Sequence, residues 1–170
     1  MKSIPLTYDH IKHLFSVPAL IYFAANISGT LSLQRGEPHT KYHNTLMYID
    51  TGSSSTSITD IDAKELGVDI NGLDMELTGG VGGFVHLPYI SNLTFLLQGE
   101  NSDYCIFTLK TVFIIKSKAK EKKVTGKGKH KETSFTGDFF PLLGIDAFNE
   151  LKGELYLSPS KGEGQIRYNP

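Results

Sequence analysis

This sequence contains one cysteine, no tryptophan and no long uninterrupted hydrophobic run. The lone Cys105 excludes an intramolecular disulfide and a zinc site made of cysteines alone, and it favours a reducing compartment. Residues 1–15 lack the continuous apolar core of a signal peptide, and residues 17–27 are too short and too broken in hydrophobicity to span a bilayer. We therefore expect a soluble, cytoplasmic protein with no membrane partner.

Net charge is also nearly absent, because 17 Lys and Arg residues face 18 Asp and Glu residues. Such a balance gives no overall attraction to nucleic acid. The exception is the stretch 116–131, where eight lysines and one glutamate give a local charge of +7. Because no aromatic residues are interleaved, this run is typical of a solvated loop, and we do not expect nucleic acid as a partner. A β-rich nucleic-acid-binding module that uses the loop is the weaker alternative.

The composition fits one β-rich domain. Hydrophobic residues make up 39% of the 170 residues, enough for a single core. Short runs rich in Val, Ile and Thr, together with 17 Gly, 8 Tyr and 10 Phe, favour strands over a helical bundle. We expect residues 1–18 to be an amino-terminal leader with a short helix over 7–15, and residues 19–170 to form one domain with a basic loop insertion at 116–133.

Alternating hydrophobicity and turn residues predict the elements of that domain. Strands are expected at 45–49, 91–98, 104–116 and 139–143, and hairpins at 20–33, 73–89 and 154–168. Short helices are expected after residue 57, capped by Asp60 or Asp62, and at 146–151.

The expected strand 45–49 runs directly into Asp50-Thr51-Gly52. A glycine at this place lets the backbone turn tightly and donate an amide hydrogen bond that fixes the carboxylate. Hydrolysis by a carboxylate pair needs a second acid close enough to share a proton, and one chain offers one such aspartate. The tripeptide alone also fits an ordinary Asx turn.

Two further segments narrow the interpretation. Residues 76–86, Glu-Leu-Thr-Gly-Gly-Val-Gly-Gly-Phe-Val-His, closely resemble the flap of retroviral aspartic proteases. Residues 141–148, Pro-Leu-Leu-Gly-Ile-Asp-Ala-Phe, resemble the family's aliphatic-aliphatic-Gly strand and the short helix after it. With Asp-Thr-Gly in family order before them, the chain resembles a single-domain retropepsin-like aspartic protease. The resemblance implies an all-β, mostly antiparallel, closed barrel-like acid-protease fold with one or two short helices.

The resemblance also implies a function and its residues. Asp50 would pair with Asp50 of a second identical chain, and the homodimer would hydrolyse peptide bonds of a peptide or protein substrate without cofactor or metal. Thr51 would hydrogen-bond across the two-fold axis, and Gly52 would accept a hydrogen bond from substrate. The implied site residues are Asp50, Thr51, Gly52 and Ser53 of the active-site loop, Gly79, Gly80, Val81, Gly82 and Gly83 of the flap, and Leu142, Leu143 and Gly144 of a supporting strand.

The chain departs from the viral pattern at three positions. Ser54 and Ile145 stand where many viral members have an acid and an arginine that brace the dimer as an ion pair. Losing both partners leaves no unpaired buried charge. Ser53 replaces the usual alanine, and its hydroxyl is expected to donate to the Asp50 carboxylate and favour ionisation. The competing function is a catalytically silent binding or scaffold domain with the same fold.

Other chemistries fit the sequence less well. Histidine pairs at 10 and 13 or at 39 and 43 have no acidic or cysteine partner at metal-ligand spacing. Ser53, Ser54 and Ser55 do not form a Gly-x-Ser-x-Gly elbow, which argues against a serine hydrolase.

Overall fold

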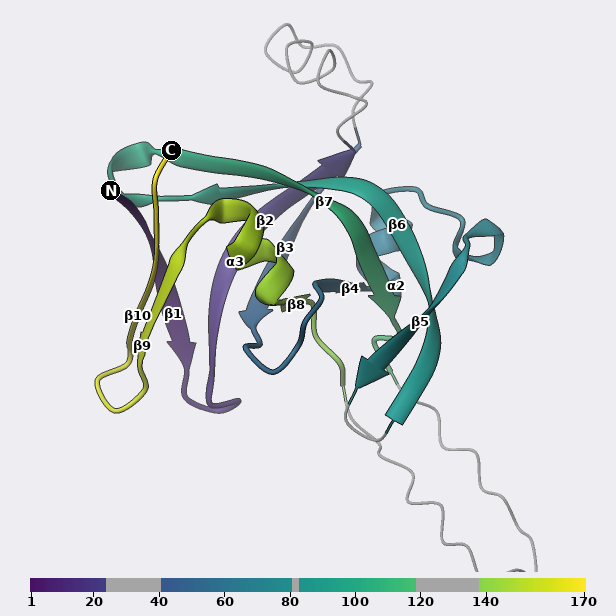
Figure 1. Cartoon of the computed structure of the whole chain (residues 1–170), viewed down its shortest axis with the longest axis horizontal. Helices are drawn as coiled ribbons and strands as arrows, with labels where there is room; N and C mark the ends of the chain where they lie inside the picture. Colours follow the sequence, from purple (N-terminus) through teal and green to yellow (C-terminus); the bar gives the residue numbers. More distant parts are fainter. Residues whose placement is uncertain (24–40, 81–82, 119–137) are drawn as a thin grey trace, which may run out of the picture.

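The computed structural model describes residues 1–23, 41–80, 83–118 and 138–170, and residues 24–40, 81–82 and 119–137 lie outside the description (Figure 1). The strands are β1 (Lys2–Asp9), β2 (Leu14–Phe23), β3 (Tyr42–Ile49), β4 (Ser57–Thr59), β5 (Met75–Gly80), β6 (Gly83–Gln98), β7 (Tyr104–Ile115), β8 (Leu142–Leu143), β9 (Glu154–Ser158) and β10 (Glu163–Tyr168). The helices are α2 (Asp60–Glu65) and α3 (Ile145–Leu151), with 3-10 turns η2 (Ile70–Gly72) and η3 (Glu100–Ser102). The predicted all-β class with one or two short helices is confirmed.

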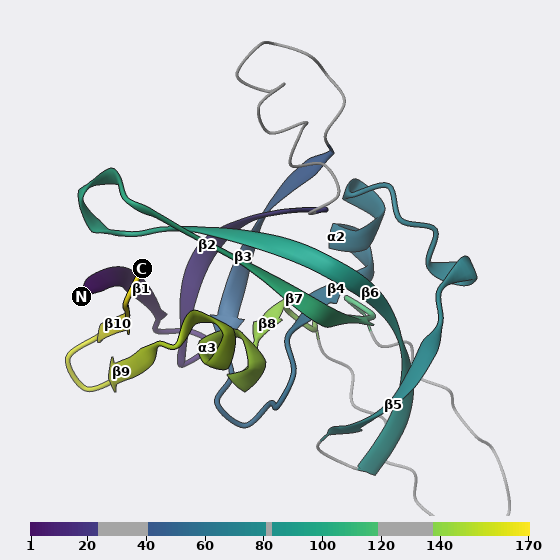
Figure 2. The same cartoon turned by 45° about the horizontal axis from the view of Figure 1, so that its top comes forward.

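All the strands belong to one 10-stranded sheet in the order β5-β6-β7-β4-β8-β3-β2-β1-β10-β9. An additional pairing of β6 with β2 closes the strands from β6 to β2 into a ring, and Figure 2 shows β6 and β7 crossing over β2 and β3. The pairs β3–β8 and β4–β7 are parallel, and the other neighbours are antiparallel, as predicted. Among the described residues, neither helix has the length and apolar composition needed to cross a bilayer.

The core is shared by the strands of the ring and by β1, β10 and α3, and it follows the period of two of the strands. On β7, Cys105, Phe107 and Leu109 are buried, whereas Tyr104 and Ile106, which alternate with them along the strand, are exposed. The Phe107 ring stacks on Phe95 of β6 with ring centroids 5.3 Å apart. Side chains buried to this degree each contribute about 1.5–3 kcal/mol of hydrophobic free energy, so the ring is a stable frame for its loops.

The predicted leader helix over residues 7–15 is wrong, because residues 2–9 form strand β1. β1 pairs with β10 from the other end of the chain and, through Thr7–Asp9, with β2. Ile4 and Leu6 are buried at a spacing of two, which a strand requires, and His13 has a left-handed backbone (φ 56°) that no helix contains. Helical spacing in residues 7–15 was misleading because the partner strand β10 lies far away in sequence.

Three local predictions also need correction. Helix α2 is capped by Thr59 and not by either aspartate: the Thr59 hydroxyl accepts from the Asp62 amide at 3.2 Å, and the Asp62 carboxylate accepts from the Thr59 amide at 2.8 Å. The expected strand 139–143 shrinks to β8, and Phe139 is 47% exposed. Of the expected hairpin 20–33, β2 covers only the start, and residues 24–33 lie outside the described residues.

The ends of the basic insertion lie side by side. Lys118 forms an isolated antiparallel bridge with Asp138, and the Phe139 amide donates to the Ser117 carbonyl at 3.0 Å. Most of the lysine run lies outside the described residues.

Candidate active site

Asp50 lies directly after β3, at a point fixed by a parallel strand. β3 pairs with β8 through Tyr48–Leu142 and Ile49–Leu143, and the Asp50 amide extends this ladder by donating to the Leu143 carbonyl at 3.2 Å. β8 also pairs with β4, where Ser57 faces Leu142. The segment between β3 and β4, residues 50–56, is called the Asp50 loop here, and β8 lies between the two strands that carry it.

The Asp50 carboxylate is held by its own loop. The Gly52 amide donates to Asp50 Oδ1 at 2.9 Å, and the Ser53 amide donates to the Asp50 carbonyl at 3.2 Å. Thr51 and Gly52 are exposed and Asp50 is half-buried. A Cβ on Gly52 would lie 3.2 Å from Asp50 Oδ1, so a side chain there would crowd the carboxylate. The loop therefore presents a fixed carboxylate at the protein surface.

The Ser53 hydroxyl does not donate its hydrogen bond to the Asp50 carboxylate, contrary to what the sequence suggested. Ser53 Oγ donates to the Ser55 carbonyl at 2.7 Å. The expectation of a hydrogen bond from Ser53 to the Asp50 carboxylate is therefore wrong, and Ser53 shapes the loop instead. The local sequence could not distinguish the two acceptors, because both lie within reach of a serine hydroxyl two or three residues away.

Gly144 permits close contact between two backbones. It follows β8 and lies directly against the Asp50 loop, where an added Cβ would come within 2.5 Å of the Ser55 carbonyl carbon. The Gly144 amide donates to Thr56 Oγ1 at 3.1 Å, and the next amide, that of Ile145, donates to the Ser53 carbonyl at 2.9 Å. Any side chain at Gly144 would displace the loop.

A carboxylate that the sequence analysis missed braces the same loop. Asp146, in the first turn of α3, accepts from the Thr56 hydroxyl at 2.7 Å and from the Thr56 amide at 2.9 Å. Thr56 is fully buried, so both of its donors depend on this partner. An acid at the start of the expected helix 146–151 was the only sequence signal, and it did not indicate a partner 90 residues away.

The residues predicted to form the flap lie in a hairpin of β5 and the first residues of β6, up to Pro88, and this hairpin is called the predicted flap. Its register pairs Gly79 with Phe84 and Gly80 with Gly83, while Val81 and Gly82 lie outside the described residues. The Phe84 ring lies over Gly79: a Cβ there would be 3.7 Å from Phe84 Cε1. Phe84 is nevertheless 82% exposed, so the predicted flap has an apolar side chain on its surface.

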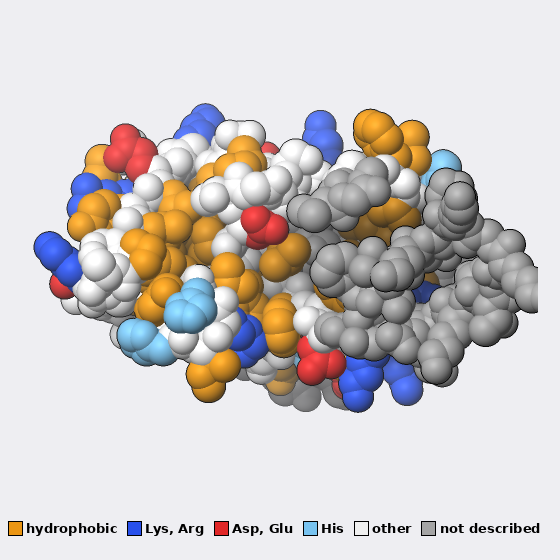
Figure 3. Space-filling model, turned by 90° about the horizontal axis from the view of Figure 1, so that it is seen from below, with side chains coloured by type: hydrophobic (Ala, Val, Ile, Leu, Met, Phe, Trp, Pro, Cys, Tyr) orange, Lys and Arg blue, Asp and Glu red, His pale blue; other side chains and the backbone are white. Residues whose placement is uncertain are grey.

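The Asp50 loop and the end of the predicted flap lie on one side of the molecule, the lower side in Figure 1. Viewed from below, hydrophobic side chains gather over the left and centre of this side (Figure 3). Exposed apolar residues from segments beside the loop include Ile145 (37% exposed) and Phe139. The Asp50 loop therefore lies on the side of the molecule that carries these exposed apolar residues.

The histidines and acids of the described residues do not form a metal site. They include no group of three or more His, Cys, Asp and Glu side chains arranged to hold an ion. His43 instead contacts Asp62, with Nε2 3.0 Å from Oδ1.

Comparison with known proteins adds information on the fold. No family model matches the sequence, and no curated protein matches it. A crystal structure of a retropepsin-like aspartic protease from Rickettsia conorii matches the model over 98% of this chain and 90% of that one, with a TM-score of 0.52 and 16% sequence identity. The chain has the fold of a retropepsin-like aspartic protease. At 16% sequence identity, this structural similarity shows the fold alone.

Within this retropepsin-like fold, the Asp50 loop is braced without the ion pair that many viral members carry. Ser54 and Ile145 contribute through their main chains, since the Asp146 amide donates to the Ser54 carbonyl at 3.3 Å and the Ile145 amide bonds Ser53. The side-chain brace is the pair Asp146–Thr56, which lies within one chain.

We expect Asp146→Ala to lower the free energy of unfolding by about 1–3 kcal/mol, because it leaves the buried Thr56 amide and hydroxyl without an acceptor. Asp146→Asn keeps one oxygen and should lose less. Urea unfolding at pH 7 measures both, with Asp74→Ala, at an exposed carboxylate, as the control. Equal stability of Asp146→Ala and the parent would show that Thr56 does not depend on this carboxylate.

Proposed function

We propose that this chain is an aspartic endopeptidase that acts as a homodimer, with Asp50 of each copy forming the catalytic pair. The observation that carries the proposal is the position of Asp50: the carboxylate stands at the end of β3 in an Asp-Thr-Gly loop, inside a retropepsin-like fold, and its orientation is fixed by the Gly52 amide. One described chain supplies half of such a pair, so a second copy completes it.

The chemistry follows from two carboxylates that share one proton, because two full negative charges about 3 Å apart are not tolerated. The ionised Asp50 takes a proton from a water held between the two groups, and the water oxygen attacks the peptide carbonyl carbon. The protonated partner polarises the carbonyl oxygen. Cleavage of the carbon–nitrogen bond then releases an amine, which receives a proton, and a carboxylic acid.

The surrounding residues support an extended peptide as substrate. Thr51 is proposed to bond across the two-fold axis and Gly52 to accept from the substrate backbone, while the flap residues Gly79–Gly83 cover the peptide. The exposed apolar side chains near the loop favour apolar substrate residues next to the scissile bond. Leu142, Leu143 and Gly144 support the Asp50 loop from within the fold. The buried single Cys105 suits a reducing compartment, and we propose the cytoplasm.

Dilution tests the shared site. We expect specific activity to fall as protomer concentration drops through the dimer dissociation constant, because each monomer holds half of the pair. Peptide cleavage and molar mass are measured along the same dilution series, with pepstatin as the diagnostic inhibitor. Specific activity that stays constant while the mass falls to that of a monomer would contradict a shared pair. A folded dimer with no cleavage would instead indicate a silent binding or scaffold domain.

A further inference from the structure

The turn between β1 and β2, residues 10–13, carries an unusual side chain. Ile11 is 91% exposed, more than any other large hydrophobic residue in the described part of the chain. Single exposed apolar residues are common on folded proteins. This turn, however, is held tightly.

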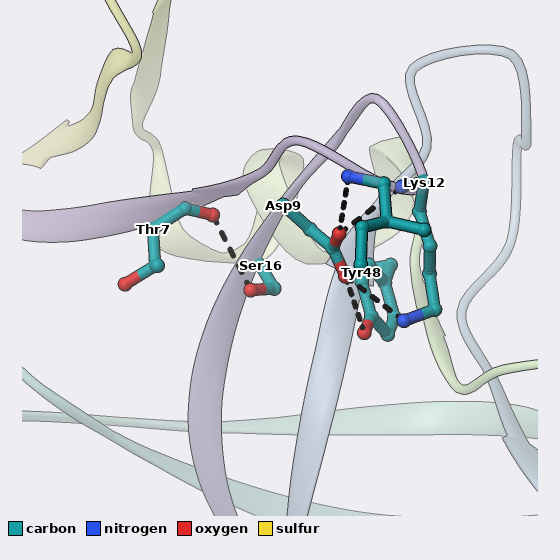
Figure 4. Close-up of polar contacts among 6 residues, drawn as sticks. Thr7, Asp9, Lys12, Ser16 and Tyr48 are labelled. Carbon is teal, nitrogen blue, oxygen red and sulfur yellow. Dashed lines mark hydrogen bonds and ion pairs between the residues drawn. The ribbon is translucent and has the colours of Figure 1, made fainter.

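Asp9 fixes the turn through its carboxylate. Oδ1 accepts from the Ile11 amide at 2.9 Å and from the Lys12 amide at 3.0 Å, and Oδ2 lies 2.9 Å from Lys12 Nζ (Figure 4). The side-chain hydrogen bond from Lys12, with the two amides, lowers the pKa of Asp9 from 3.8 to about 2. The carboxylate therefore stays ionised, and the hydrogen bonds of the turn persist, until the pH falls close to this value.

The turn is also attached to the strand that carries Asp50. The Tyr48 hydroxyl, two residues before Asp50, lies 3.4 Å from Asp9 Oδ2. Lys12 Nζ lies over the Tyr48 ring at 5.2 Å and over the Phe140 ring at 4.9 Å, and Phe140 stands just before β8. Because β3 and β8 together position Asp50, the place of Ile11 is fixed relative to the catalytic carboxylate.

The charges around Ile11 suit burial at an interface. Asp9 and Lys12 neutralise each other, so a surface that covers the turn would not bury an unpaired charge from this pair. The turn and the Asp50 loop project to the same, lower side of the molecule in Figure 1.

We propose that Ile11 is a contact of the homodimer interface and packs against a second copy of this chain beside the paired Asp50 residues. This inference rests on the proposed function, because the carboxylate pair requires the second copy to approach on the side of the Asp50 loop. A two-fold axis there uses each contact twice, so one rigid isoleucine supplies two buried side chains.

Ile11→Asp tests the proposal, with Ile106→Asp as the matched control. Ile106 is 58% exposed and lies near the start of β7, beside the β6–β7 turn at the upper edge in Figure 1. Any residue other than proline keeps the amide at position 11 that bonds Asp9, so Ile11→Asp and the milder Ile11→Ser should fold like the parent, as circular dichroism checks. Sedimentation equilibrium then gives the dimer dissociation constant of each protein.

We expect Ile11→Asp to raise the dimer dissociation constant at least about tenfold, Ile11→Ser to raise it less, and Ile106→Asp to leave it unchanged. A parent chain that is monomeric at all concentrations, or an Ile11→Asp dimer as tight as the parent's, overturns the proposal.

The mass measurement is independent of catalysis. If Ile11→Asp dissociates the dimer while Asp50→Asn cleaves peptides as well as the parent, the interface stands and the proposed function falls. If Asp50→Asn is inactive while Ile11→Asp dimerises normally, the proposed function stands and the Ile11 contact is wrong.

Discussion

Asp50→Asn is expected to reduce the rate of peptide cleavage by about 10²- to 10⁴-fold, the contribution typical of a general acid or base. Asparagine has nearly the same shape as aspartate, and its carbonyl oxygen can still accept from the Gly52 amide, which lies 2.9 Å from Asp50 Oδ1. The amide group cannot ionise, so it cannot activate a water. The loss should therefore appear in kcat with the fold unchanged.

The control for this variant is Asp69→Asn. Asp69 caps the η2 turn by accepting from the Asn71 amide at 3.1 Å, and asparagine caps equally well. Cleavage of a pepstatin-sensitive peptide substrate and thermal unfolding are measured for both variants. Turnover by purified Asp50→Asn equal to that of the parent would rule out Asp50 as the catalytic carboxylate.

Gly144→Ala is expected to lower the free energy of unfolding by about 1–3 kcal/mol or more, the usual range for overpacking. The new Cβ would lie 2.5 Å from the Ser55 carbonyl carbon and 2.6 Å from its oxygen. Both atoms belong to the backbone, so no side chain can rotate away and the Asp50 loop must move. Because Gly144 has φ −86° and ψ −178°, which alanine adopts without strain, the clash alone explains the effect.

Gly72→Ala is the matched control, because a Cβ at Gly72 would meet nothing within 4 Å. Urea unfolding of the two variants separates a general glycine effect from the contact with Ser55. We also expect Gly144→Ala to cleave peptides more slowly, since the displaced loop carries Asp50. Unfolding free energies that agree for Gly144→Ala and Gly72→Ala would contradict the close approach of the two backbones.

Local features of the sequence predicted much of this molecule. Alternating apolar residues predicted the β7 strand, and glycines on both sides of residues 81–82 predicted the flap hairpin. Asp-Thr-Gly after an apolar strand gave the candidate carboxylate, because the Gly52 amide that fixes it is only two residues away. The strand and the hairpin were confirmed because each depends on neighbours along the chain, and the catalytic role of Asp50 stays a prediction.

The features that the sequence did not reveal depend on contacts between distant segments. Helical spacing at 7–15 was outweighed by the pairing of β1 with β10. The Ser53 hydroxyl donates to the Ser55 carbonyl and not to the Asp50 carboxylate. The partnership of Asp146 with Thr56 joins residues 90 positions apart. Thus the sequence alone determined the strand-rich class through strand periodicity, and its resemblance to retropepsin-like proteases, carried by residues 50–52, 76–86 and 141–148, indicated the acid-protease fold and the candidate carboxylate. Only the tertiary structure decided what holds the Asp50 loop in place and joins the turn of Ile11 to β3, because Asp146 and Tyr48 meet their partners only when the fold brings distant segments together.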